Sequence, residues 1–348
     1  MPTTYAIPNG RTVMDASLFT GTGSNGLVVT NNDLGSNGFY PDLIWIKSRN
    51  ATYYNNLLDY PRGASVRLFS NLTDAESNNG CQSSFNTNGF TLNADAGGVN
   101  NSGTTYVAWQ WNAGSGTTSS NTAGSITSTV DVNATAGFSI VKYTGNGTSG
   151  ASVGHGLGVA PSFIITKSRN QSQNWNCYHV SIGASAGIYL NLTQGQGNTT
   201  AYWNGVTPTS SVFYLGNSGE TNSSGNPIIA YCWAEVAGFS KFGSYIGNGN
   251  ADGPFLYTGF KPKFVMYKKS TNGASGSWFM VDSTRNPSNT ANLWLQANTS
   301  DAEQTDTAID LNSNGFKIRT AGVGTNNSGD TYIYIAFAEN PFKYANAR

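Results

Sequence analysis

Three apolar stretches of this chain share one pattern of hydrophobic and polar positions. Each stretch starts after a proline, continues through mostly apolar and aromatic residues, and ends at a lysine six residues beyond the proline. The anchors are Pro41 with Lys47, Pro161 with Lys167, and Pro262 with Lys268. Proline is accepted at the first position of a strand but not inside a central strand. The pattern therefore predicts one buried strand, repeated three times.

Two turn signals recur with these strands. A Gly-x-Gly turn follows an aromatic residue at 19–23, 143–147 and 245–249. A Ser-Gly turn then precedes a stretch of β-branched and aromatic residues, which suits a strand in a sheet core. Eight residues past the glycine of that turn stands an aromatic anchor, which is Trp111, Trp233 or Phe337. The signals return at intervals of roughly a hundred residues, so the chain contains three copies of one unit, called repeats below.

The repeats predict an all-β protein of three tandem β-sandwich modules, each jelly-roll-like, because short strands and turn signals alternate closely. The predicted modules are residues 1–112, 137–236 and 237–348. Residues 113–136 between the first two are rich in glycine, serine and threonine, which predicts a flexible or extended linker. A β-propeller is a weaker alternative, since one blade spans only about 40–50 residues.

The composition agrees with strands rather than helices. Charged residues make up 10% of this chain of 348 residues, whereas a typical soluble protein has about 25%. The 42 glycines and the many asparagines, serines and threonines all rank low in helix propensity. The surface is therefore expected to consist largely of neutral polar groups.

The charge balance limits the classes of partner. Eighteen basic residues balance eighteen acidic ones, so the formal net charge is zero. Nucleic acid and anionic lipid attract a basic surface, and neither is therefore expected as the main partner. The first eleven residues lack the apolar core of a signal peptide, and no stretch approaches the ~20 apolar residues of a membrane span. We expect synthesis in the cytoplasm and no membrane insertion.

The cysteines and histidines do not indicate a metal site. Cys81, Cys177 and Cys232 lie far apart and form no C-x-x-C motif. They are predicted to be small buried residues rather than disulfide or zinc ligands. His155 and His179 lack the helical spacing of a zinc-binding pair. We predict no metal and no cofactor.

Two short catalytic motifs occur in surroundings that do not suit them. Residues 21–26 match the glycine pattern of a dinucleotide-binding loop, which requires a helix after it, but the apolar residues that follow predict a strand. Residues 183–187 match the nucleophile elbow, which requires a histidine later in the chain. Both histidines precede Ser185. We interpret both motifs as loops and predict no catalytic residue.

Two carboxylate pairs repeat, as Asp74 with Glu76 and Asp301 with Glu303. Within a strand such residues share a face about 7 Å apart, a separation within the broad range that glycosidases use. Both pairs stand in stretches rich in asparagine and threonine, which predict loops. Solvated acidic loops are the preferred interpretation.

A second repeated pattern of charge joins Asp59 with Arg62 and Asp282 with Arg285. We predict structural ion pairs, buried or half-buried, that fix the end of a strand. The middle repeat has residues 179–182, His-Val-Ser-Ile, at this place. The difference argues against an enzyme site shared by all three repeats.

Aromatic residues in polar stretches are candidates for binding. Tyr202 and Trp203 lie in one loop-like stretch, and Trp175 follows another. A ring on a neutral surface stacks on a sugar or anchors a protein interface. Trp175 aligns with Trp278, which keeps a core role open for both. Tyr202, Trp203 and Trp175 are the predicted surface-binding residues, with Trp203 the strongest of them.

Several longer strings resemble a protein family of tailed marine bacteriophages. They include PDLIWIKSRN at 41–50, TTYVAWQW at 104–111, the glycine-rich stretch at 145–158 and YCWAEVAGFSKFG at 231–243. The likeness covers nearly the whole chain. Members of that family are usually labelled tail-fibre, tail or virion structural proteins.

The resemblance implies a non-enzymatic virion protein that is assembled in the host cytoplasm. It implies a tail-fibre or tail-tip adhesin that contacts a host-surface protein or polysaccharide, with other virion proteins as partners and a homotrimer as the assembly. The alternative is a capsid decoration or head-fibre protein bound to the major capsid protein. A receptor-degrading enzyme ranks last, because no carboxylate pair repeats in all three copies.

Overall fold

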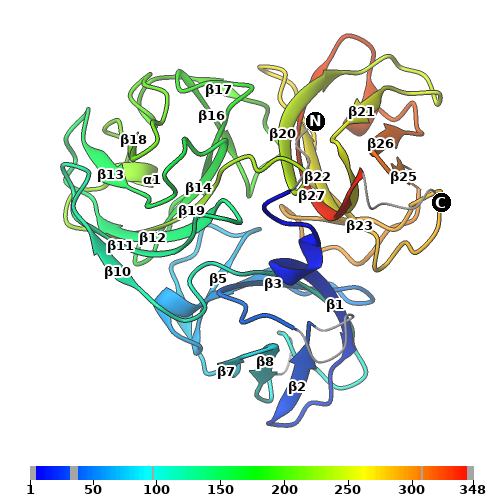
Figure 1. Cartoon of the computed structure of the whole chain (residues 1–348), viewed down its shortest axis with the longest axis horizontal. Helices are drawn as coiled ribbons and strands as arrows, with labels where there is room; N and C mark the ends of the chain where they lie inside the picture. The colour runs from blue at the N-terminus through cyan, green and yellow to red at the C-terminus, as the bar shows by residue number, and fades with distance from the viewer. Residues whose placement is uncertain (1–4, 32–37, 96–97, 307–308, 343–348) are drawn as a thin grey trace.

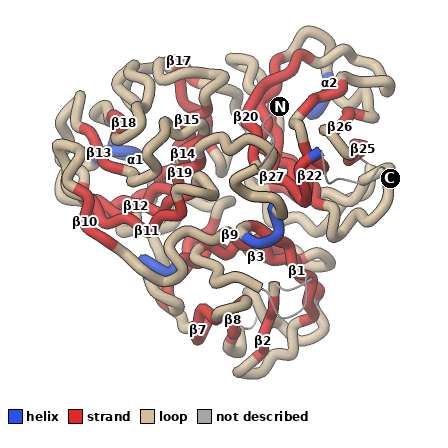
Figure 2. Tube along the Cα trace, in the orientation of Figure 1, coloured by secondary structure: helices blue, strands red, loops and turns tan. Residues whose placement is uncertain are grey.

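The strands that follow the three prolines all form in the computed structural model, which describes residues 5–31, 38–95, 98–306 and 309–342 (Figure 1). In these residues the helices are single turns, and strands predominate (Figure 2). The helical turns are η1 (Gly10–Thr12), η2 (Tyr60–Arg62), α1 (Gly219–Asn222) and α2 (Val323–Asn326). The all-β prediction is confirmed.

The predicted first and third modules extend beyond the described residues. Residues 1–4 of the predicted first module and 343–348 of the third lie outside the described residues. In the part of the chain that the structure describes, none of the helices has the length and apolar character needed to cross a membrane.

The first repeat forms a six-stranded antiparallel sheet and a smaller sheet of three strands. The order in the large sheet is β1-β9-β3-β4-β5-β6, and in the small sheet it is β2-β8-β7. The strands are β1 (Met14–Thr20), β2 (Leu27–Thr30), β3 (Leu43–Ser48), β4 (Asn56–Asp59), β5 (Val66–Phe69), β6 (Ser77–Asn78), β7 (Gln82–Asn86), β8 (Gly89–Leu92) and β9 (Thr105–Trp111).

The second repeat forms an eight-stranded sheet with a two-stranded sheet beside it. The large sheet has the order β10-β11-β12-β19-β14-β15-β16-β17, and the small one pairs β13 with β18. The strands are β10 (Ser119–Asn121), β11 (Ser128–Asn133), β12 (Phe138–Thr144), β13 (Ser152–Gly154), β14 (Phe163–Ser168), β15 (Asn176–His179), β16 (Ala186–Tyr189), β17 (Gly197–Asn198), β18 (Val212–Tyr214) and β19 (Pro227–Trp233).

The third repeat forms a five-stranded sheet and a three-stranded sheet. Their orders are β20-β27-β22-β23-β24 and β21-β26-β25. The strands are β20 (Ser240–Ile246), β21 (Phe255–Tyr257), β22 (Phe260–Lys269), β23 (Phe279–Asp282), β24 (Leu295–Gln296), β25 (Ile309–Asn312), β26 (Gly315–Ile318) and β27 (Thr331–Pro341).

The three large sheets share one strand order. In each of them the strand that leads into the Gly-x-Gly turn pairs with the last strand of the repeat, the last with the Pro-to-Lys strand, and that strand with the next, as in β1-β9-β3-β4, β12-β19-β14-β15 and β20-β27-β22-β23. The Pro-to-Lys strands therefore have a partner on each side, which explains why they read as nearly continuous apolar runs. In a jelly roll the strand after them would lie in the opposite sheet. Here it stays in the same sheet, so each unit has β-sandwich character but departs from the jelly-roll order.

The position of the prolines differs between repeats. Pro41 and Pro161 lie just before β3 and β14. Pro262 lies inside β22, where the pairing with β27 shifts register on both sides of it. The prediction of a first strand position is therefore wrong for Pro262. A bulge accepts proline because the ladder of hydrogen bonds is already interrupted there.

Residues 113–136 do not behave as a free linker. They form β10 and β11, and β11 adds to the edge of the second large sheet with Val130 opposite Val141. Val130 is buried, since only 3% of it is exposed. The prediction of a flexible connector is corrected here, because an apolar residue at alternate positions is enough for a polar strand to pair with an open sheet edge.

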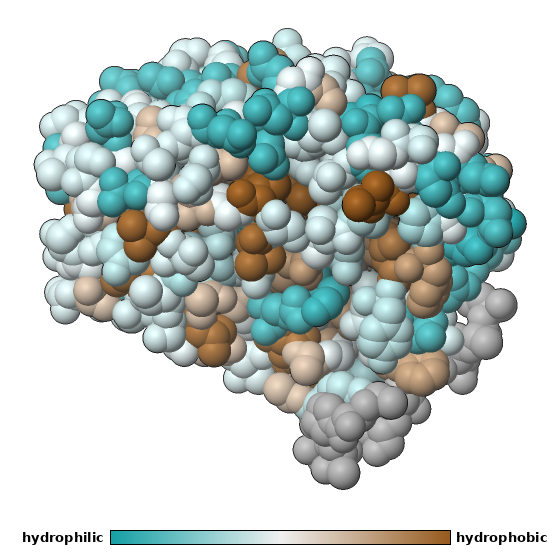
Figure 3. Space-filling model, turned by 90° about the horizontal axis from the view of Figure 1, so that it is seen from above, coloured by the Kyte–Doolittle hydropathy of each residue, from teal (hydrophilic) through white to brown (hydrophobic). Residues whose placement is uncertain are grey.

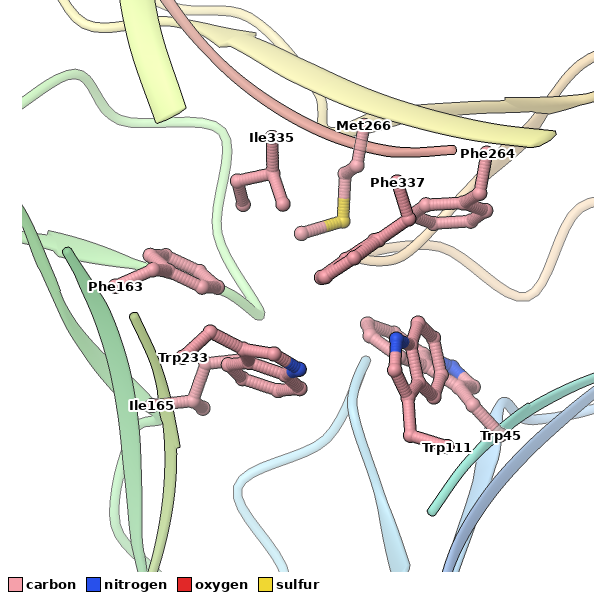
Figure 4. A pocket seen from close by; sticks show the side chains of 9 residues that line it. All are labelled: Trp45, Trp111, Phe163, Ile165, Trp233, Phe264, Met266, Ile335 and Phe337. Atoms are coloured by element: carbon pink, nitrogen blue, oxygen red, sulfur yellow. The ribbon is translucent and has the colours of Figure 1, made fainter. Parts of the chain in front are cut away.

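The large sheets turn one face each toward a common centre (Figure 1). There the ring centroid of Trp111 lies 6.1 Å from that of Trp233, 5.8 Å from Phe264 and 5.7 Å from Phe337. Trp111, Trp233 and Phe337 are the three aromatic anchors of the sequence, one from each repeat. Figure 4 shows these side chains converging with Trp45, Ile165 and Met266 from the three directions.

The opposite faces carry separate contacts to the small sheets. In the first repeat Ile44 belongs to a cluster with Phe90 of β8, and in the second Ile164 belongs to a cluster with Phe213 of β18. In the third repeat Phe316 of β26 is continuous with the central cluster. The expected picture of three separate cores is therefore incomplete, because the repeats also bury a shared core among them.

Candidate functional site

One loop of each repeat docks onto the neighbouring repeat. A backbone N–H of the loop donates to a backbone carbonyl oxygen that follows the neighbour's Pro-to-Lys strand. The pairs, donor first, are Glu76 with Arg169 (2.7 Å), Gln196 with Ser270 (3.1 Å) and Glu303 with Arg49 (2.7 Å). The first repeat thus contacts the second, the second contacts the third, and the third contacts the first. We call these contacts the first, second and third junctions of a closed ring.

The first junction contains a chain of charges that starts from a buried ion pair. Nε of Arg62 lies 2.5 Å from Oδ2 of Asp59, and both side chains are fully buried. Glu76 lies 3.8 Å from Arg62 and 2.8 Å from Nη2 of Arg169 in the second repeat. The hydroxyl of Tyr231 in the second repeat donates to Oδ2 of Asp59 at 2.6 Å. The predicted Asp59–Arg62 pair is confirmed, and it also joins two repeats.

The third junction repeats this arrangement with different residues. Arg285 lies 2.6 Å from Asp282 and 3.0 Å from Glu303, and Glu303 lies 2.7 Å from Nη2 of Arg49. Nε1 of Trp109 donates to Oδ2 of Asp282 at 3.0 Å. Burial alone would raise the pKa of Asp282, but the charge and hydrogen bonds of Arg285 hold it below its ordinary value. The predicted Asp282–Arg285 pair is confirmed.

The second junction has a histidine where the other two have an aspartate. His179 takes the place of the buried aspartates, and its Nδ1 accepts from the N–H of Ser181 at 3.1 Å while its Nε2 donates to the carbonyl oxygen of Tyr334 at 3.2 Å. Both ring nitrogens are used in the way that an uncharged imidazole requires. Burial lowers the pKa of His179 to about 4. At neutral pH the two adjacent repeats therefore meet here without a formal charge on this ring.

The lysine anchors also belong to the junctions. Nζ of Lys47 donates to the carbonyl oxygen of Ser300 at 2.7 Å, and Nζ of Lys268 donates to that of Thr193 at 3.0 Å, in each case across to the docking loop of another repeat. Lys167 donates to carbonyl oxygens of its own repeat. Burial lowers the pKa of Lys47 and Lys167 to about 8 and that of Lys268 to about 7.

The carboxylate pairs do not lie side by side as free groups. Glu76 and Glu303 are held by arginines at the junctions. Asp74 and Asp301 are exposed in the loops that precede them, as the interpretation of solvated acidic loops requires. The glutamates belong to the interior of the ring rather than to an open cleft.

The predicted surface-binding tryptophans are buried, so this prediction is wrong for both. Trp203 is 1% exposed and packs with the ring of Tyr178 inside the second repeat. Trp175 is fully buried, and its Nε1 donates to the carbonyl oxygen of Phe69 across the first junction at 2.9 Å. Tyr202 is partly buried and packs against the core cluster of the second repeat. A tryptophan in a polar stretch is drawn inward because burying its large apolar ring outweighs the polarity of its neighbours.

The remaining sequence motifs form loops. Residues 21–26 join β1 to β2, and residues 183–187 enter β16, so neither precedes a helix. Cys81, Cys177 and Cys232 are buried free thiols, as predicted. Among residues 5–31, 38–95, 98–306 and 309–342, no group of three or more histidine, cysteine, aspartate and glutamate side chains is placed to hold a metal ion.

Two surface hollows lie where repeats meet. One, of about 340 Å³ at the third junction, is lined by Thr52, Tyr53, Tyr54 and Ser300. The other, of about 270 Å³ at the second junction, is lined by Tyr189 and the loops 194–197 and 272–274. Sequence reasoning missed the first hollow, although two adjacent tyrosines in a polar stretch are a signal for it. The docking of Ser300 beside them is a tertiary contact that no local pattern reveals.

Comparison with known proteins gives a family but no described activity. No curated protein matches the chain, and no solved structure matches it. A family model described as a domain of unknown function, DUF7483, matches residues 11–341. That match includes every strand described above, and the chain therefore belongs to the DUF7483 family.

Proposed function

We propose that this protein is a non-enzymatic structural component of a tailed-phage virion, a tail-fibre or tail-tip adhesin that contacts a protein or glycan on the host surface. The support is the resemblance of its sequence to phage virion proteins, together with a surface built for contacts between neutral groups. The face in Figure 3 is largely hydrophilic or neutral, with hydrophobic residues in separate small patches.

The single observation that carries this proposal is the small number of charged side chains and their location. Only 10% of the residues are charged. Four of the arginines, namely Arg49, Arg62, Arg169 and Arg285, are engaged in the ion pairs of the junctions. The outer surface therefore carries few charges and many hydroxyl and amide groups, which bind by hydrogen bonds rather than by a long-range field.

The ring also suits a particle exposed to harsh surroundings. Each repeat is tied to both others by buried polar contacts and by the central core, so no repeat unfolds without exposing apolar surface of its neighbours. The partners in the proposal are other virion proteins and the host receptor. The homotrimer that the resemblance implies stays a prediction, which the mass of the protein in solution tests. A monomer would mean that the internal ring takes the place of a trimer of chains.

Adsorption to host cells tests the adhesin. Purified, fluorescently labelled protein is expected to bind intact host cells saturably and to compete with adsorption of whole phage. A protein that neither binds nor competes, under conditions in which the phage adsorbs, would contradict the proposal.

A second candidate is a capsid decoration or head-fibre protein on the major capsid protein. The observation that favours it is the closed ring of three similar repeats, which matches the local threefold positions of a capsid lattice. Gold-labelled antibody on intact particles separates the two functions. Label at the tail tip supports the adhesin, and label spread over the head supports decoration.

A further inference from the structure

The hollow at the third junction is made jointly by the first and third repeats. Thr52, Tyr53 and Tyr54 come from the loop between β3 and β4 of the first repeat, and Ser300 comes from the docking loop of the third. Its volume of about 340 Å³ lies at the small end of the range, roughly 300–1,000 Å³, that small-molecule sites occupy. We call this hollow the tyrosine cleft.

Tyr54 presents a fixed aromatic ring in this cleft. The residue is 49% exposed, and its ring meets that of Phe69 edge to face with centroids 5.4 Å apart. The guanidinium of Arg67 lies 5.1 Å above the Phe69 ring on β5. The contact with Phe69 orients the Tyr54 ring in the free protein, which reduces the entropy lost when a ligand binds.

The ring is specific to the first repeat. Asn55, Trp175 and Trp278 are equivalent, because each side chain donates to backbone carbonyls of the repeat that docks onto it. The residue before each is Tyr54, Asn174 or Ser277. Of the three equivalent positions, only the one in the first repeat therefore carries an aromatic ring, although the backbone arrangement repeats.

The remaining groups in the cleft are polar and uncharged. Thr52 and Ser300 contribute hydroxyl groups, and the hydroxyl of Tyr53 accepts from Nδ2 of Asn101 at 2.9 Å. The carbonyl oxygens of Tyr53 and Ser300 accept from the buried ammonium of Lys47 and are thus already used. Hydroxyl groups beside an aromatic face, without an apolar pocket, suit a ligand with hydroxyls on its edge and C–H bonds on its face.

We propose that the tyrosine cleft binds a neutral saccharide. This proposal rests on the proposed adhesin function and names the chemistry of its receptor. One face of a sugar ring stacks on Tyr54, and its hydroxyls bond to Thr52 and Ser300. The exposed carboxylate of Asp301, next to Ser300, interacts with the Lys47 ammonium, so these two charges offset each other and the cleft favours a neutral sugar over uronic and sialic acids. Because the cleft spans the third junction, bound sugar holds the ring closed.

A saccharide array with the full-length protein tests the proposal. The wild type is expected to bind neutral glycans in preference to anionic ones, with one site per chain by calorimetry. Tyr54→Ala should weaken binding about tenfold or more, while Tyr54→Phe, which keeps the stacking face, should stay within a few fold of the wild type. The bound glycan should also raise the melting temperature of the wild type but not of Tyr54→Ala.

Phe255→Ala is the matched control, because Phe255 is 46% exposed on β21 and does not line the cleft. It should bind like the wild type. No glycan binding by the wild type, equal binding by Tyr54→Ala, or equal loss in Phe255→Ala would overturn the inference. Circular dichroism of each variant shows that the fold is retained.

Adsorption to host cells keeps the two proposals apart. Protein that adsorbs to host cells but binds no glycan overturns the cleft and leaves the adhesin standing. Protein that binds a neutral glycan through Tyr54 but does not adsorb to cells supports the cleft and counts against the adhesin.

Discussion

Arg49 and Glu303 are separated by 254 positions in the sequence and form a two-pronged ion pair in the structure. Both Nε and Nη2 of Arg49 donate to the carboxylate, with the shortest distance 2.7 Å. The carboxylate of Glu303 also pairs with Nη1 of Arg285, whose side chain is fully buried. This carboxylate therefore joins the last repeat to the first and completes the ring.

Glu303→Gln should open the third junction. The amide removes the negative charge that Arg49 and Arg285 share, while Asp282 still pairs with Arg285, and we expect the free energy of unfolding to fall by about 2 kcal/mol. Urea denaturation measures the loss. Glu235→Gln is the control, because Glu235 and its partner Lys241 are each 37% exposed, and such a surface pair contributes less than about 1 kcal/mol. Equal losses in the two variants would contradict a structural role for the third junction.

The second junction should accept the ion pair of the other two. Gln196 and Ser270 stand where Glu303 and Arg49 stand, so Gln196→Glu combined with Ser270→Arg places the same charges opposite each other. We expect the double variant to be more stable than the sum of the single effects, with a coupling energy of about 1 kcal/mol. A double-mutant cycle from urea unfolding measures it. Zero coupling would show that the two junctions are not equivalent.

Acid should weaken the second junction through His179. Its pKa is about 4 in the folded protein and about 6.5 in an unfolded chain. Between these values the unfolded chain binds a proton that the folded protein does not, so the free energy of unfolding falls as the pH falls. For this residue the loss reaches about 3 kcal/mol near pH 4.

Comparison with His179→Gln isolates that contribution. The variant should show a shallower decline of stability between pH 6.5 and about 4 than the wild type in urea unfolding. Some decline should remain, because burial also lowers the pKa of His155. Parallel stability curves for the two proteins would remove His179 from the acid response.

Truncation of Trp111 should destabilise all three repeats together. Its ring contacts rings of both other repeats, and the side chain is 3% exposed. Trp111→Ala should lower the free energy of unfolding by about 3–5 kcal/mol. Calorimetry is expected to show one transition that moves as a whole. Separate transitions, of which only one moves, would restore the picture of independent modules.

Much of the local structure could be predicted from sequence alone. The Pro-to-Lys strands were found because a central strand needs apolar residues on both faces. Such a strand therefore has a run of consecutive apolar residues in the sequence. The Asp59–Arg62 and Asp282–Arg285 pairs were found because the same acid and base, three positions apart, recur in two repeats. The buried cysteines followed from their spacing and type in the same way.

The tertiary structure decided which side chains are buried and which segments pair at a sheet edge. Trp203 and Trp175 stand among polar neighbours, but their rings are buried by residues far along the chain, and Trp175 is buried across a junction. Residues 113–136 became strands because β12 offered an open edge. Sequence by itself determined the Pro-to-Lys strands and which charges pair locally, since those depend on neighbours a few positions away. The ring, the shared core and the tyrosine cleft depend on contacts between residues dozens to hundreds of positions apart, which no local pattern encodes.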